Sequence, residues 1–160
     1  MNRTAFSNCR GRKGFVIRDL SDHELIELYG VREAVEGHAA FMVAGNRSPE
    51  KMAAIRTAVE AEFLLKERTL EDDFKSNLHI HRTIVEQADN RVLLDIFDGI
   101  WGRGISLWLF AAARTNQAQP DPDVHHQLLE VLQNGSPEDA RSAMTEHIRE
   151  GLSQHHKGSG

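Results

Sequence analysis

Apolar side chains recur at three- and four-residue steps along most of this chain, and that spacing is the strongest constraint on its fold. Such steps place apolar residues on one face of a helix. Between residues 21 and 154 we find no alternating strand pattern and no internal repeat. The sequence therefore predicts an all-α fold, an antiparallel bundle of about six to seven helices. The apolar stripes cover residues 25–43, 52–63, 70–88, 92–114, 123–134 and 140–152.

Capping sequences mark where these helices begin. Ser21, Thr69 and Ser136 each lie three residues before an acidic residue, which is the spacing of a capping box. Ser48 is followed by proline, a residue favoured at the first helical position, and Asn90 precedes the fourth apolar stripe. Helices are thus predicted to begin at these five positions.

The fourth predicted helix, residues 92–114, contains glycine at positions 99, 102 and 104. Each glycine costs about 1 kcal/mol relative to alanine inside a helix. We therefore expect this helix to kink or break near these residues.

Length and charge divide the chain into three parts. With 160 residues and one cysteine, it is long enough for a single core without disulfides. Residues 1–18 contain five basic residues and no acid, while the chain as a whole has a net charge of −5. An acidic body is a poor partner for a phosphate backbone. We expect a helical domain over residues 21–154, a basic segment over 1–20 and a disordered tail over 155–160.

One helical face gathers groups that could bind a metal. Asn77 and His81 are four residues apart and lie one turn from each other on the same face, while His79 points nearly the opposite way. His125 and His147 lie in later helices, which an antiparallel bundle could bring to the same point. Three imidazoles and one carbonyl oxygen would form a metal site.

Several spaced motifs resemble the FCD effector-binding domain of FadR-type GntR transcriptional regulators. Together they extend over about residues 21–150. The matching segments are Arg32-x-x-Val35-Glu36-x-x-Ala39-Ala40, Asn77-x-x-Ile80-His81 with Asn90, His125 with Leu128-Leu129 and Gly135, and Ala140 with Met144 and His147. Residues 10–18 resemble the last wing strand of the winged helix-turn-helix domain that precedes FCD in these regulators, so residues 1–20 are interpreted as a remnant of that wing and its linker.

The resemblance implies a divalent metal held by Asn77, His81, His125 and His147. The family usually has aspartate at the first of these positions. Asparagine can coordinate through its carbonyl oxygen but brings no negative charge, so metal affinity should fall while zinc or nickel stays preferred. Asp73, one turn earlier, is an alternative acid. His126 is the alternative to His125, because adjacent helical residues point about 100 degrees apart.

The resemblance also implies a small carboxylate effector, an organic or sugar acid. Arg32 is the candidate for gripping that carboxylate, and a salt bridge to Glu36 is the competing interpretation of the same residue. Phe97, Trp101 and Trp108 are interpreted as core residues rather than pocket residues.

The sequence thus predicts a sensory domain of a transcriptional regulator and not an enzyme. We expect a cytoplasmic homodimer without a membrane segment, which contacts DNA only through a winged helix-turn-helix domain absent from this chain. Two alternatives stay open: a stand-alone metal-dependent hydrolase, for which no general base is evident beside the histidines, and a metal-free helical interaction module.

Overall fold

The computed structural model describes residues 22–64, 69–102 and 123–157, and within these residues the chain forms helices and no strand. None of these helices is long and apolar enough to cross a membrane. The prediction of an all-α fold is confirmed. The helices are α1 (Asp22–Gly45), α2 (Pro49–Phe63), α3 (Leu70–Glu86), α4 (Arg91–Trp101), α6 (Val124–Asn134) and α7 (Pro137–Lys157).

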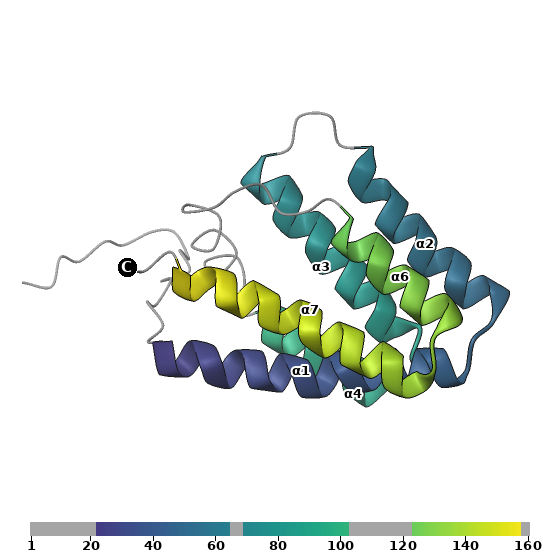
Figure 1. The fold of residues 1–160 in the computed structure, drawn as a ribbon, viewed down its shortest axis with the longest axis horizontal. Coiled ribbons are helices and arrows are strands. Elements are labelled where there is room, and N and C mark those ends of the chain that lie inside the picture. Colours follow the sequence, from purple (N-terminus) through teal and green to yellow (C-terminus); the bar gives the residue numbers. More distant parts are fainter. Residues whose placement is uncertain (1–21, 65–68, 103–122, 158–160) are drawn as a thin grey trace, which may run out of the picture.

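The first and last helices lie side by side and run in opposite directions (Figure 1). Helices α2, α3 and α6 pack beside one another at one side of this pair, and α4 packs against α1 and α3. The core fills the space between these helices. Its fully buried large side chains include Leu25, Ile55, Ile80, Ile84, Phe97, Leu132, Met144 and Ile148.

A glycine allows α1 and α7 to approach closely. A Cβ atom on Gly37 would lie 2.9 Å from the Thr145 Oγ1 atom, closer than side chains tolerate. A side chain at this position would force the Thr145 hydroxyl to move, so glycine suits this close contact. At the edge of this contact, Arg149 forms an ion pair with Glu33 at 2.8 Å.

The predicted helix starts are confirmed wherever they fall within the described residues. Thr69 and Asp72 form a capping box, and Ser136 and Asp139 bond each other's backbone N–H groups in the same way. The side chains of Ser48 and Asn90 accept hydrogen bonds from the third residue after each. Ser21, the fifth predicted cap, lies outside the described residues.

One predicted boundary needs correction. Helix α2 ends at Phe63, where its apolar stripe ends. Helix α7 continues to Lys157, so the predicted tail boundary at residue 155 comes too early. The helix continues through Gly151, and its last residue, Lys157, is basic, which is favourable at a helix C-terminus.

The expected break in the fourth helix occurs at its second glycine. Helix α4 ends at Trp101, and Gly102 is its C-cap. Gly104 and Trp108 lie outside the described residues, so the rest of the predicted helix stays a prediction. Phe97 and Trp101 belong to the core, as expected.

Arg47 joins the α1–α2 connection to the end of α6. It donates hydrogen bonds to the backbone oxygens of Leu132 and Gly135, which are among the carbonyls that a helix end leaves without helical partners. Arg47→Ala should lower the free energy of unfolding by about 1 kcal/mol, a value reduced for its exposed position. Urea titration measures this. Arg56→Ala, at an exposed position within α2, is the control, and equal effects of the two substitutions would contradict the prediction.

Candidate metal centre

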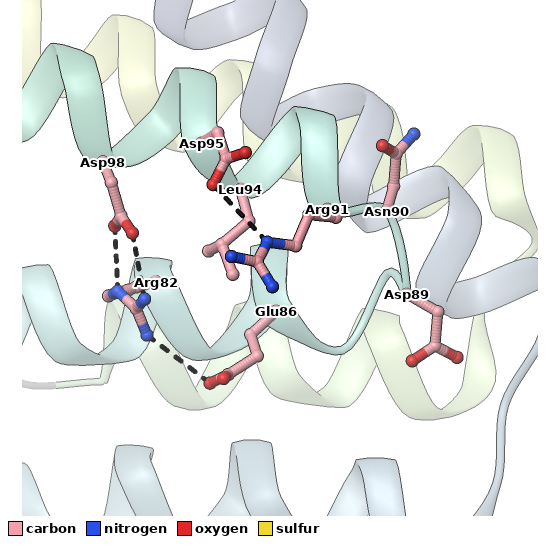
Figure 2. A pocket seen from close by; sticks show the side chains of 8 residues that line it. All are labelled: Arg82, Glu86, Asp89, Asn90, Arg91, Leu94, Asp95 and Asp98. Atoms are coloured by element: carbon pink, nitrogen blue, oxygen red, sulfur yellow. Dashed lines mark hydrogen bonds and ion pairs between the residues drawn. The ribbon is translucent and has the colours of Figure 1, made fainter.

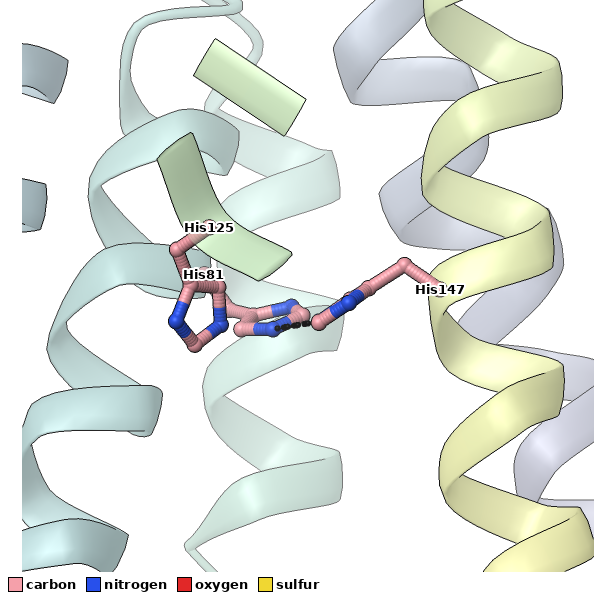
Figure 3. A group of neighbouring side chains, drawn as sticks. All are labelled: His81, His125 and His147. Atoms are coloured by element: carbon pink, nitrogen blue, oxygen red, sulfur yellow. Dashed lines mark hydrogen bonds between the residues drawn. The ribbon is translucent and has the colours of Figure 1, made fainter. Parts of the chain in front are cut away.

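Three histidines from three helices meet inside the bundle. His81 of α3, His125 of α6 and His147 of α7 each offer one ring nitrogen, and these nitrogens lie within 4.8 Å of one another (Figure 3). The His81 and His125 side chains are buried and His147 is partly buried. Residues separated by up to 66 positions in the chain therefore form one compact group.

His81 is held by a glutamate from the first helix. Its Nδ1 atom lies 2.5 Å from the Glu36 Oε2 atom, and both side chains are 1% exposed. The other Glu36 oxygen accepts hydrogen bonds from Arg32 Nε at 2.9 Å and from Trp101 Nε1 at 3.4 Å. Burial alone would raise the pKa of Glu36, but Arg32 and then His81 outweigh it and lower that pKa to about 2. Glu36 is therefore a buried carboxylate anion.

Arg32 forms a salt bridge with Glu36, which is one of the two roles that the sequence predicted for it. Its guanidinium pairs with Glu36 and lies over the rings of Trp101, at 4.5 Å, and Tyr29, at 5.0 Å. Burial works against the charge of Arg32, yet Glu36 and Tyr29 raise its pKa overall. The arginine is thus a fixed cation beside the histidine group, and its role toward an effector stays a prediction.

His125 is held in the same way by a glutamate from the second helix. Its Nδ1 atom lies 2.7 Å from the Glu62 Oε2 atom. The His125 Nε2 atom is buried and has no hydrogen-bond partner among the described residues. His126 instead packs edge-on against Phe63, with ring centres 4.4 Å apart, so His125 is the histidine that joins the group.

His147 completes the group from the last helix. Its Nε2 atom lies 3.1 Å from the Nε2 atom of His81, and its ring centre lies 5.0 Å from that of His125. Burial, followed by the neighbouring His81 and His125, lowers the pKa of His147 well below its usual value. Burial also lowers the pKa of His81, although Glu36 acts in the opposite direction. Both rings therefore favour the neutral form, which is the form that binds metals.

Asn77, the fourth predicted ligand, lies on α3 one turn before His81 and is partly buried. Asp73, one turn earlier still, is 2% exposed but does not belong to the group of converging ligand atoms. His79 is exposed, as expected from its position on the opposite face. Coordination by Asn77 stays a prediction.

Sequence reasoning did not assign Glu36 and Glu62 to the site. A signal was present, because both glutamates occupy core-facing positions within apolar stripes: Glu36 beside Val35 and Ala39, and Glu62 beside Val59. A buried carboxylate needs a charged or hydrogen-bonding partner. The pattern could thus have indicated that partners exist, but their identity required the arrangement of the helices.

A charged surface groove between α3 and α4 is separate from the histidines (Figure 2). Arg82 forms two hydrogen bonds with Asp98, at 2.8 and 2.9 Å, and lies 3.6 Å from Glu86. Arg91 faces Asp95 at 3.8 Å. Both arginines thus lie beside acids of the groove itself, and none of the three histidines lines it.

The histidine group fits a bound metal ion on two observations. A buried ring nitrogen without a partner, His125 Nε2, faces the other two rings, and uncompensated burial of such an atom is costly. Glutamates also bond the outer ring nitrogens of His81 and His125, which is the usual arrangement around metal-binding histidines. Imidazole nitrogens suit zinc and nickel.

The chain is similar to a known domain family and to a known regulator. Residues 27–150 match the FCD domain family. The chain is 27% identical over 141 residues to a probable transcriptional repressor of a D-xylose utilization operon from Paenarthrobacter nicotinovorans. The match covers 84% of this chain but only 59% of that repressor, so the chain spans a little over half the length of this relative.

Two solved structures share the fold. McbR/YncC of E. coli superposes with a TM-score of 0.73 at 17% identity, over 88% of this chain and 68% of that one. A GntR family transcriptional regulator from Pseudomonas syringae pv. tomato superposes with a TM-score of 0.69 at 15% identity, over 85% and 56%. Because the family match covers most of the helical domain, this chain belongs to the FCD family, the effector-binding domains of GntR-type transcriptional regulators.

Proposed function

We propose that this chain senses a small carboxylate through a divalent metal ion and thereby controls a transcriptional regulator of the FadR subfamily. The observation that carries this proposal is the convergence of three buried or partly buried imidazoles, one of which has a buried nitrogen without a partner. Leaving such a nitrogen without a partner is costly, and a metal ion bound among the three rings would satisfy it.

The proposed ligands are His81, His125 and His147, with the carbonyl oxygen of Asn77 as the fourth. Three imidazoles favour zinc or nickel over magnesium or calcium. All four ligands are neutral, so the full charge of the cation remains to attract an anion. A bound metal would supply a Lewis-acid position that a carboxylate oxygen can occupy.

Arg32 is the proposed second contact for the effector. Its Nε atom is already bonded to Glu36, and its guanidinium plane rests on Trp101. A carboxylate could therefore reach the other guanidinium nitrogens or exchange with Glu36. Either event would alter the contact between α1 and the histidine group, because Glu36 also bonds His81.

The proposed output is a change in DNA binding. The related repressor is longer than this chain, and we place DNA contact in a winged helix-turn-helix domain outside the chain, in a cytoplasmic homodimer. An effector acts on such a dimer only if it prefers one arrangement of the helices. Rearranging the helices would change the spacing between the two DNA-reading domains.

Calorimetric titration of the zinc-loaded protein with sugar and hydroxy acids tests the proposal. The relative's link to D-xylose suggests D-xylonate as one test acid. Xylitol is its matched neutral control, since the two open-chain molecules differ only at C1. We expect at least one acid to bind, and its neutral counterpart to bind at least tenfold more weakly.

Two controls complete this experiment. Chelation of zinc should abolish acid binding, and His81→Ala should do the same because it removes a proposed ligand. Failure of every acid to bind the zinc-loaded protein would overturn the proposed effector class. Equal binding with and without zinc would show a metal-free binding domain instead.

A further inference from the structure

Two of the three histidines are fixed from outside the group by buried glutamates. Glu36 of α1 bonds the Nδ1 atom of His81, and Glu62 of α2 bonds the Nδ1 atom of His125. The glutamates come from different helices than the histidines, and they are 1% and 7% exposed. The same carboxylate contact thus occurs twice, on separate ligands of one group.

These contacts determine which ring nitrogen can bind a metal. A carboxylate accepts hydrogen bonds, so the Nδ1 atoms of His81 and His125 must carry the protons. In a neutral imidazole the other nitrogen, Nε2, then keeps its lone pair. Both Nε2 atoms are therefore ready to coordinate before any ion arrives.

We propose that Glu36 and Glu62 are positioning residues of the metal centre. They hold His81 and His125 as Nε2 ligands through hydrogen bonds to the opposite ring nitrogen of each. This inference rests on the proposed metal binding and deepens it. Carboxylates in this position raise the basicity of the ligating imidazole and fix its orientation.

His147 differs from the other two ligands. Its Nε2 atom lies 3.1 Å from the Nε2 atom of His81. Since His81 carries its proton on Nδ1, the Nε2 atom of His147 must donate this hydrogen bond. To bind a metal through Nε2, His147 must release that proton to water and take up another at Nδ1. His147 is the least buried of the three histidines.

Zinc affinity of four isosteric variants tests the positioning role. Competition against a chromophoric zinc chelator should show tenfold to a hundredfold weaker binding in Glu62→Gln and in Glu36→Gln, the usual cost of removing such a carboxylate. Glu60→Gln on α2 and Glu27→Gln on α1 are matched controls, because both glutamates are exposed and neither bonds a histidine of the group. Their zinc affinity should stay within about twofold of the wild type, well below the effect expected at a positioning carboxylate.

Nitrogen-15 NMR spectra of the histidine rings show which ring nitrogen carries the proton. A general loss of stability would not change this position. We expect His81 and His125 to carry their protons on Nδ1 both without and with zinc, and His147 to change from Nε2–H to Nδ1–H when zinc binds. In Glu62→Gln, His125 alone should lose its fixed proton position. Glu36→Gln removes the charged partner of Arg32 and could prevent folding. In that case Glu62→Gln alone tests the positioning role.

The outcomes separate this inference from the proposed function. Zinc binding by the wild type with unchanged affinity in both glutamine variants would overturn the positioning role and leave metal sensing intact. Coordination of His81 or His125 through Nδ1 would overturn it as well. A wild-type protein that binds no zinc would overturn the proposed metal centre together with this inference.

Discussion

Arg32→Met should lower the free energy of unfolding by about 3–5 kcal/mol, the range found when one member of a buried ion pair is removed. Arg32 is 11% exposed and its partner Glu36 only 1%. Methionine keeps most of the apolar volume of arginine. The loss of stability therefore comes from the missing charge and not from a cavity. Among the described residues, His81 and Trp101 would then be the remaining hydrogen-bond partners of this buried carboxylate. Urea unfolding in the presence of a chelator measures the effect without a contribution from metal.

A double variant tests the explanation. Arg32→Met combined with Glu36→Gln removes both charges, so it should recover at least half of the loss, since two buried charges can be replaced together at little cost. Arg56→Met, at an exposed position of α2, should change stability by less than about 0.5 kcal/mol. A loss below about 1 kcal/mol for Arg32→Met would contradict the view that this pair is anchored in the core.

Helix starts were the most predictable part of the fold because their chemistry is local. A serine or threonine three residues before an acid satisfies the first backbone N–H groups wherever the helix lies. Thr69 and Ser136 therefore cap helices as expected. The end of α7 was less predictable, because Gly151 lies within the helix and does not end it.

The three converging histidines could be picked out from the sequence, but their arrangement could not be derived from it. The four-residue step from Asn77 to His81 is local and could be read from the sequence. The meeting of His81 with His125 and His147 depends on how α3, α6 and α7 pack, and the resemblance to FCD domains supplied that expectation. The structure brings these three histidines together.

The contacts of Glu36 and Glu62 with the histidines could not be predicted from the sequence. Glu36 and His81 are 45 residues apart, and Glu62 and His125 are 63 apart. The positions of the two glutamates within apolar stripes indicate that they are buried but do not show which residues they contact. Many pairings of buried acids with histidines agree with the same helical periodicity, and only the packed bundle selects one of them.

Zinc should stabilise the wild-type domain by about 2.7 kcal/mol when its free concentration is one hundred times the dissociation constant, because an ion that binds only the folded state adds stability by mass action. His125→Ala should remove this gain, since it deletes the nitrogen that lacks a partner. His126→Ala is the matched control at the adjacent position, where the ring packs against Phe63 instead. Thermal unfolding with and without zinc, after chelation and dialysis, measures all three proteins.

Asn77→Asp separates a working metal centre from a chance cluster of histidines. If Asn77 faces the ion, the added negative charge should tighten zinc binding, and the midpoint of stabilisation should move to lower zinc concentration. His79→Asp changes the exposed face of the same helix and should leave that midpoint unchanged. Equal responses of the two variants would mean that charge on α3 acts only at long range, and that Asn77 is not the fourth ligand.

An unchanged unfolding temperature of the wild type at saturating zinc would remove the basis for metal-dependent sensing, and effector recognition would then depend on Arg32 alone.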